Sequence, residues 1–193
     1  MKKIITIFTL IIFTNYSYGQ KKLKKDIDND GIDDTVFIDS AKSTIVCKLS
    51  TLNFKSISSK PIEILNETCG IRNSKNGFKF YNDWMRAGYE NQFRYNPKTK
   101  KIQLIGMSRY VLGNAFHDGS GESSVNLLTD DYIGNWNYYD MKKGELITVP
   151  TIKTKMKFEN INLEDFSEDT YFSYDEKCAE LFNKYKKIKM MKK

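Results

Sequence analysis

Five carboxylates lie within nine residues near the start of the chain, in the segment DIDNDGIDD at residues 26–34. Aspartates fill the first, third, fifth and ninth positions of this segment, and Gly31 fills the sixth. Side chains at the first, third and fifth positions converge when the backbone coils tightly, and glycine permits the positive φ that such coiling requires. Converging carboxylates repel one another unless a cation binds between them. The spacing therefore predicts a cation site.

The predicted ligands are all oxygen atoms. They are the side chains of four aspartates and one backbone carbonyl: Asp26, Asp28, Asp30, Asp34 and the carbonyl of Ile32. Calcium accepts about six to eight hard oxygen ligands, whereas magnesium prefers a strict octahedron and retains its waters. Calcium is accordingly the predicted cofactor. The alternative interpretation of the segment is a hydrophilic spacer.

The spacing does not fit an EF-hand, which places a bidentate glutamate at the twelfth position, where this chain has Phe37. The motif D-x-D-x-D-G-x-x-D, followed directly by a strand at residues 35–38, resembles instead the calcium loops of FG-GAP, integrin-type repeats and similar exported bacterial modules. The resemblance implies ligation by the four aspartates and the Ile32 carbonyl, with Asp33 facing solvent. The unit occurs once, so the propeller formed by repeated FG-GAP units is not implied.

Strand-forming segments follow the acidic loop at intervals of roughly ten residues. The clearest is residues 89–96, where Tyr89, Asn91, Phe93 and Tyr95 alternate with polar residues on the other face. Other strands are predicted at residues 35–38, 44–49, 61–65, 101–105, 124–128, 133–139 and 145–149. Because no helical pattern separates these strands, we expect an antiparallel β meander that forms a curved sheet or a sandwich.

The C-terminal segment changes to a helical period. Ser173 and Glu176 form a capping box, and the apolar residues that follow fall on one face up to about Lys187. The predicted fold class is therefore mainly β (α+β), with a C-terminal helix packed on the sheet. The predicted organisation is a signal peptide (1–19), a basic lead and calcium loop (20–34), an antiparallel β domain (35–158), and an acidic connector with the helix and a basic tail (159–193).

The first nineteen residues have the three parts of a signal peptide. Lys2 and Lys3 precede the largely apolar run at residues 4–13, and small residues at 17–19 offer a cleavage site. The run is too short to span a hydrocarbon core of about 30 Å. No later segment reaches the roughly 18 apolar residues of a membrane span. We therefore expect an exported protein, periplasmic or secreted, without a transmembrane segment in its mature chain.

The positive charge is concentrated at the ends of the chain. The formal net charge is +7, yet residues 26–183 contain 19 basic and 24 acidic residues. The remaining basic residues lie in the first three residues, in KKLKK at 21–25 and in the tail at 184–193. Nucleic-acid binding requires a basic face on the folded domain. No nucleic-acid partner is predicted.

Three cysteines allow one disulfide in an oxidising compartment. Cys178 lies on the apolar face of the predicted helix, and Cys69 precedes Gly70 in a turn-like segment. We therefore expect a bridge between Cys69 and Cys178. Cys47 falls within a predicted strand, where a thiol packs as a small buried apolar group.

Residues with catalytic chemistry gather in one loop. His117 is the only histidine, and Asp118, Ser120 and Glu122 follow it closely. Neighbours along an extended chain point in different directions, so these residues do not assemble a nucleophile and its base, and no catalytic residue is predicted. A polar ligand-binding loop is the alternative. The aromatic strand at 136–139 offers another alternative, an exposed platform for a glycan.

These observations predict a calcium-stabilised, exported, β-rich binding or structural module that is not an enzyme and has an unknown protein or glycan partner. Two other classes remain open. One is an envelope hydrolase that uses the loop from His117 to Glu122, and the other is a glycan-binding protein.

Overall fold

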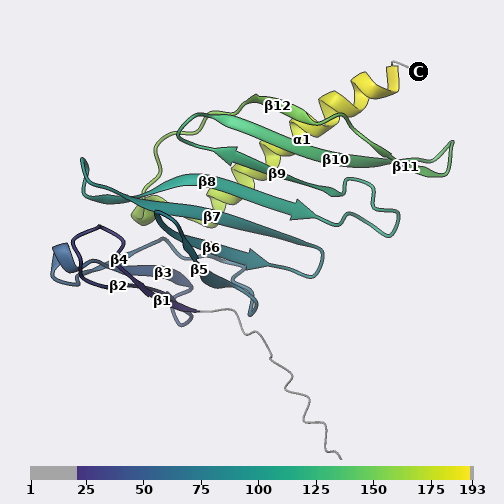
Figure 1. Ribbon diagram of the computed structural model, residues 1–193. Coiled ribbons are helices and arrows are strands. Elements are labelled where there is room, and N and C mark those ends of the chain that lie inside the picture. Colours follow the sequence, from purple (N-terminus) through teal and green to yellow (C-terminus); the bar gives the residue numbers. More distant parts are fainter. Residues whose placement is uncertain (1–20, 192–193) are drawn as a thin grey trace, which may run out of the picture.

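The computed structural model describes residues 21–191, which form two antiparallel sheets and one long helix (Figure 1). The predicted signal peptide at residues 1–19 lies outside the described residues. The mainly β prediction with a C-terminal helix is confirmed. The smaller sheet has four strands paired in chain order: β1 (Lys22–Lys25), β2 (Asp34–Asp39), β3 (Thr44–Lys48) and β4 (Ser56–Ser58).

The larger sheet is a meander in which every strand after the first, except the last, pairs with the strand before it. Its strands are β5 (Gly70–Ser74), β6 (Gly77–Asp83), β7 (Ala87–Asn96), β8 (Lys101–Val111), β9 (Gly121–Asn126), β10 (Asp131–Asp140), β11 (Glu145–Thr148) and β12 (Ile152–Lys155). β12 pairs with the first half of β10, and β11 pairs with its second half. Two short 3₁₀ turns, η1 (Ser50–Leu52) and η2 (Leu163–Asp165), interrupt the connections.

The helix α1 (Glu168–Met191) lies across one face of the larger sheet, behind the strands in Figure 1. It begins earlier than predicted, at Glu168, where the Ser167 N–H and the Thr170 hydroxyl form half of a capping box. The backbone N–H of Ser167 donates to the Thr170 hydroxyl at 3.5 Å, and the Ser167 hydroxyl contacts Asp169 at 3.2 Å. No helix within residues 21–191 combines the length and apolar character needed to cross a membrane.

The alternation predicted for β7 separates a buried face from a polar one. Tyr89 and Phe93 are buried on the side of α1, and the ring of Tyr171 from the helix stacks on Tyr89 with centroids 4.2 Å apart. Glu90 and Gln92 belong to the other face. The buried side chains of both sheets and of α1 form one cluster, so a single core supports the whole structure.

One predicted strand is absent. Residues 61–65 form turns instead, although Ile62 is fully buried and its N–H donates to the carbonyl of Ser43 at 2.8 Å. The apolar pattern there therefore reflects burial in the connection between the two sheets, and not pairing in a ladder. No sequence pattern predicted β1, β4, β5, β6 or β12.

The predicted disulfide between Cys69 and Cys178 is not formed, and all three cysteines are free and buried. The sulfur of Cys178 contacts the Ser123 hydroxyl on β9 at 3.4 Å, whereas Cys69 directly precedes β5. Four strand spacings of about 4.8 Å separate β5 from β9. The resulting gap of about 19 Å is far longer than the roughly 7 Å between Cα atoms that a disulfide can bridge. The apolar face of α1 was predicted correctly, but the strand beneath it was not.

Candidate metal centre

The acidic loop joins β1 to β2. Lys25 pairs with Asp34 at the end of this hairpin, so residues 26–33 are the connection itself. Gly31 has a φ of 86° and Asn29 a φ of 63°, which gives the chain the tight coil that the spacing predicted. The coil brings Asp26, Asp28 and Asp34 close together over a short length of backbone.

Asp26 organises the first half of the loop. Its Oδ1 accepts hydrogen bonds from the backbone N–H groups of Asn29 at 2.7 Å and Asp30 at 3.2 Å. Its Oδ2 accepts one from Gly31 at 3.0 Å. Aspartate favours such turns because its short side chain reaches backbone donors a few residues ahead.

Asp34 anchors the second half and is fully buried. Its Oδ2 accepts from the backbone N–H groups of Ile27 at 2.7 Å and Asp28 at 3.3 Å. Its Oδ1 accepts from the N–H of Ser50, in η1, at 2.8 Å. A buried carboxylate needs donors of this kind to offset its lost hydration.

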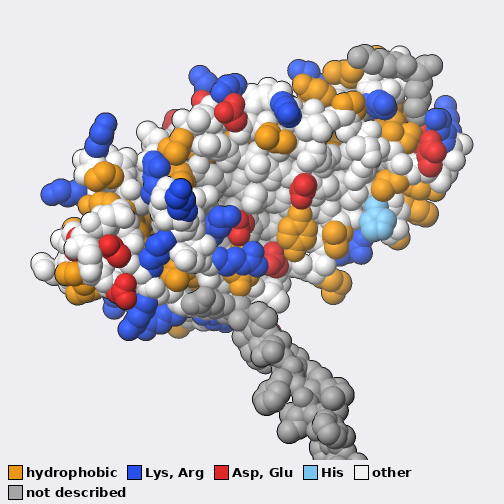
Figure 2. All heavy atoms as spheres, viewed as in Figure 1, with side chains coloured by type: hydrophobic (Ala, Val, Ile, Leu, Met, Phe, Trp, Pro, Cys, Tyr) orange, Lys and Arg blue, Asp and Glu red, His pale blue; other side chains and the backbone are white. Residues whose placement is uncertain are grey.

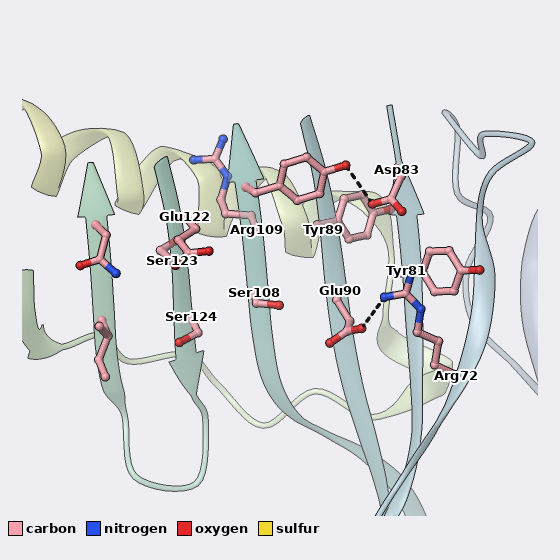
Figure 3. Close-up of a pocket in the computed structure, with 13 residues that line it drawn as sticks. Arg72, Tyr81, Asp83, Tyr89, Glu90, Ser108, Arg109, Glu122, Ser123 and Ser124 are labelled. Carbon is pink, nitrogen blue, oxygen red and sulfur yellow. Dashed lines mark hydrogen bonds and ion pairs between the residues drawn. The ribbon is translucent and has the colours of Figure 1, made fainter. Parts of the chain in front are cut away.

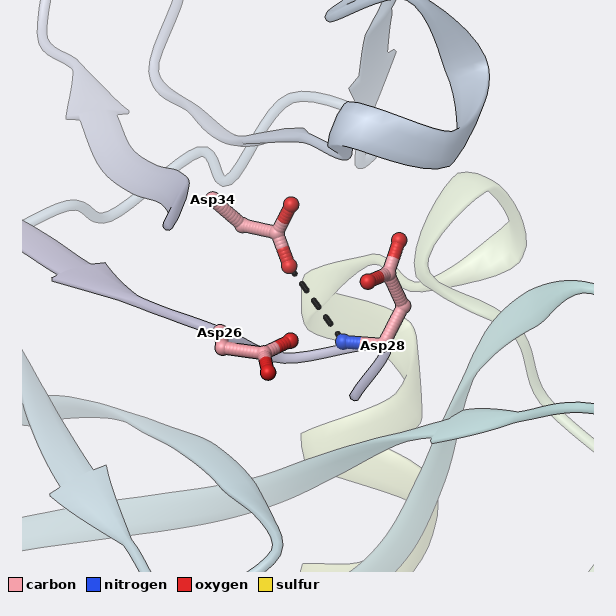
Figure 4. A group of neighbouring side chains, drawn as sticks. All are labelled: Asp26, Asp28 and Asp34. Carbon is pink, nitrogen blue, oxygen red and sulfur yellow. Dashed lines mark hydrogen bonds between the residues drawn. The ribbon is translucent and has the colours of Figure 1, made fainter. Parts of the chain in front are cut away.

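Asp28 completes a group of three carboxylates, shown in Figure 4 with Asp26 and Asp34. One oxygen from each of these residues can be chosen so that all three lie within 4.8 Å of one another. Asp28 is 9% exposed, and its Oδ2 accepts a hydrogen bond from the Thr51 hydroxyl at 2.5 Å. Its Oδ1 is buried and has no hydrogen-bond donor in the described structure. An unpartnered buried carboxylate oxygen is costly unless a cation or another donor reaches it.

Asp30, Ile32 and Asp33 lie outside this group. Asp30 accepts from the Ser50 hydroxyl at 2.6 Å and from the N–H of Ile32 at 2.8 Å. These bonds, led by that from Ser50, hold the pKa of the Asp30 carboxyl below its usual value. Asp33 is exposed, in keeping with the expectation that it faces solvent. Three of the four predicted aspartates are thus brought together, and the fourth is turned toward η1.

The negative charge of the loop has no basic counterpart. Within the part of the chain that the structure describes, no lysine or arginine forms an ion pair with any of the five loop aspartates. The nearest lysine in sequence, Lys25, instead directs its ammonium group to Asn73 at 2.9 Å and to the carbonyl of Ser74. Burial raises the pKa of the Cys47 thiol, and the negative charges of Asp34 and Asp28 raise it further.

Ser50 and Thr51 are the members of this centre that sequence reasoning missed. They lie in η1, some sixteen or more positions beyond the loop, and contact it through their hydroxyls and one backbone N–H. Their sequence carries no ligand-like spacing, so only the packing of η1 against the loop places them there. The resulting set of carboxylate and hydroxyl oxygens fits a hard cation such as calcium.

The loop around His117 does not gather its polar side chains. The Nδ1 of His117 lies 3.0 Å from the carbonyl of Leu112, and Asp118 accepts from the N–H of Tyr139 at 2.8 Å. Ser120 is buried beside Asn137, and Glu122 projects from β9. The four predicted residues therefore make separate contacts and do not form one site.

The aromatic strand at 136–139 does not form an exposed platform. Trp136 and Tyr138 are 3% and 1% exposed, and they belong to the core under α1. The indole N–H of Trp136 donates to the Tyr132 hydroxyl at 3.1 Å. A glycan surface on this strand would need side chains other than these two.

Comparison with known proteins adds no family: no protein-family model, no curated protein and no solved structure matches the chain.

Proposed function

We propose that the protein is an exported β module whose N-terminal hairpin is stabilised by calcium, and that its role is binding or structural and not enzymatic. The observation that carries the proposal is the buried Oδ1 of Asp28, which has no donor and belongs to a group of three carboxylates. A cation beside it would partner this oxygen and offset the repulsion among Asp26, Asp28 and Asp34.

Calcium is favoured over magnesium by the irregular oxygen set. The loop offers carboxylates with nearby hydroxyls from Ser50 and Thr51, and calcium accepts such flexible arrangements more readily than magnesium does. The predicted Ile32 carbonyl and the Asp30 carboxylate would complete the shell. Asp30 would then exchange its hydrogen bond from Ser50 for the ion.

Export supports a structural use of the ion. The signal-peptide pattern of residues 1–19 directs the chain to compartments where calcium reaches the millimolar range. Extracellular modules commonly bind calcium with dissociation constants of about 10⁻⁴–10⁻³ M, so at about 1 mM calcium such a site would be occupied for at least about half of the time. The ion would then be a structural part of the fold and not a signal.

Calorimetric titration of the mature chain with calcium chloride, after removal of divalent cations with a chelator, tests the proposal. We expect one bound ion and a higher unfolding temperature with calcium than with chelator. At a calcium concentration about one hundred times the dissociation constant, linkage predicts about 2.7 kcal/mol of added stability. Magnesium at the same concentration should produce a smaller shift.

A matched pair of variants locates the ion. Asp28→Asn and Asp33→Asn remove the same charge from the same loop, but only Asp28 belongs to the carboxylate group. We expect Asp28→Asn to abolish most of the calcium response and Asp33→Asn to retain it. The absence of calcium-dependent heat, together with equal unfolding temperatures in calcium and in chelator, would refute the proposal and leave the loop a solvated connection.

A further inference from the structure

The face of the larger sheet opposite to α1 carries a hollow. Figure 3 shows this face toward the viewer, with the helix behind the strands. The hollow has a volume of about 490 Å³, and a second one of about 420 Å³ adjoins it. The two share Glu90, Ser108 and Ser124 in their linings, so they form one continuous trough across the strands.

Strand register explains why the sheet is hollow there. One residue from each of five neighbouring strands falls in a row across this face: Tyr81, Glu90, Ser108, Ser124 and Ile133. The two serines occupy the middle of the row, and larger side chains stand at either end. Gly106 continues the low floor into the second hollow. The depression therefore follows from small residues at central positions of a regular sheet.

A second row provides groups that can recognise a ligand. It runs through Asp83, Gly88, Tyr110, Glu122 and Asn135. Tyr110 is 37% exposed, and its hydroxyl donates to Asp83 at 3.3 Å. The Glu122 carboxylate is exposed and has no hydrogen-bond or ion-pair partner among the described residues. An aromatic ring thus stands between two carboxylates, beside the hydroxyls on the floor.

The charges of the trough balance. Apart from Arg109, three basic and three acidic side chains contribute to its lining: Arg72, Lys79, Arg94, Asp83, Glu90 and Glu122. Glu90 accepts from Lys79 at 2.6 Å and from Arg72 at 3.4 Å, so these charges are largely neutralised within the protein. Arg109 also borders the trough, but its guanidinium group pairs with Asp175 of α1. In Figure 2 the middle of this face is mostly uncharged.

We propose that this trough binds a neutral oligosaccharide. Sugar hydroxyls would donate to Glu122 and exchange hydrogen bonds with Ser108, Ser124 and Asn135, while a C–H face of a sugar ring would lie on Tyr110. A balanced set of charges offers no net attraction to a polyanion or a polycation. An open trough suits a chain of several sugar units better than a single enclosed one. The inference rests on the proposed binding role but not on calcium, because the acidic loop belongs to the other sheet.

The test is calorimetric titration of the mature protein with four neutral hexasaccharides: cellohexaose, maltohexaose, xylohexaose and chitohexaose. We expect at least one to bind with a dissociation constant below about 1 mM, and polygalacturonate and a lysine-rich peptide not to bind. Glu122→Gln should weaken binding about tenfold or more, because hydrogen bonds to a charged acceptor are the stronger ones. Ser124→Trp should abolish binding by filling the floor.

Two control variants on β11 match these changes outside the trough. Glu145→Gln and Thr148→Trp alter exposed residues that line neither hollow, and both should leave binding unchanged. If Ser124→Trp fails to fold, Glu122→Gln still decides the result. Absence of heat with all four hexasaccharides at about 5 mM overturns the inference, as does binding that Glu122→Gln leaves intact or exclusive binding of the charged polymers. Each titration is run in calcium and in chelator, which separates this failure from failure of the calcium proposal.

Discussion

The carboxylate of Asp34 accepts a hydrogen bond from the backbone N–H of Ser50 at 2.8 Å, and it thereby ties the start of β2 to η1. Its other oxygen holds the backbone of Ile27 and Asp28. One fully buried side chain therefore fixes both ends of the acidic loop. These bonds use protein donors, so Asp34 supports the loop with or without a cation.

Replacement of Asp34 should destabilise the protein even in chelator. Asp34→Ala leaves two buried N–H groups and one partly buried N–H group without their acceptor, and we expect the free energy of unfolding to fall by about 2–4 kcal/mol. Asp33→Ala, at an exposed position, should change it by no more than about 0.5 kcal/mol. Urea unfolding curves recorded in chelator measure both. Equal midpoints for the two variants would contradict the anchoring role.

The ion pair between Arg109 and Asp175 should be worth more than an ordinary surface pair. The Arg109 side chain is 8% exposed, and its Nη1 lies 2.5 Å from Asp175 on α1. Asp175→Asn leaves the buried guanidinium without its charged partner, so we expect a loss of about 2 kcal/mol, reduced by the partial exposure of Asp175. Chemical denaturation measures this loss. Glu180→Gln, on the exposed side of the same helix, is the control and should have no measurable effect.

Alkaline pH should unfold the protein through its buried tyrosines. Burial raises the pKa values of Tyr89, Tyr132 and Tyr174 above the usual value of about 10. Because these folded-state pKa values are raised, the stability that the neutral rings contribute is fully present below pH 10 and is lost as the pH rises above it. Absorbance of tyrosinate should therefore increase cooperatively with the loss of tertiary circular dichroism. Gradual ionisation of all tyrosines before unfolding would show that these rings are accessible.

The glycine that opens β9 should not tolerate a side chain. At Gly121, where φ is 155°, an added Cβ would lie 2.1 Å from the carbonyl oxygen of Asn135 and 2.6 Å from the Trp136 ring. We expect Gly121→Ala to cost about 2–4 kcal/mol. Gly119→Ala is the matched control, because its φ of 74° is also positive but its Cβ would meet open space, and about 1 kcal/mol is expected there. Thermal unfolding of the two variants would show this difference.

Local patterns in the sequence were sufficient to predict the regular parts of the fold. The alternation in residues 89–96 and the turn after it correctly predicted β7, β8 and the hairpin between them, because side-chain direction in a strand depends only on neighbouring residues. The spacing of the aspartates likewise predicted the coil at Gly31. Apolar residues at helical spacing predicted which side of α1 is buried.

Features that depend on long-range packing could not be predicted in this way. The contact of Ser50 with the acidic loop, and the choice of Ser123 and not Cys69 as the neighbour of Cys178, arise from the order of strands in the two sheets. β1 was not predicted, because its lysines are as typical of an exposed N-terminal segment as of an edge strand. The trough also depends on strand register. The sequence indicated which face of β7 is polar, but it did not indicate that this face aligns with Ser108 and Ser124.

The meander of the larger sheet has a consequence for how the protein forms during synthesis. From β5 to β10 each strand pairs with the strand made just before it. The sheet can therefore grow by closing short loops, each of which costs little conformational entropy, as the chain emerges. The helix α1 is made after all of these strands. Until it docks, the face that carries Tyr89 and Trp136 remains uncovered and prone to stick to other apolar surfaces. The nascent chain therefore forms a nearly complete sheet whose apolar face is exposed to solvent. This exposure, and the risk of aggregation that it brings, ends when α1 docks on the sheet.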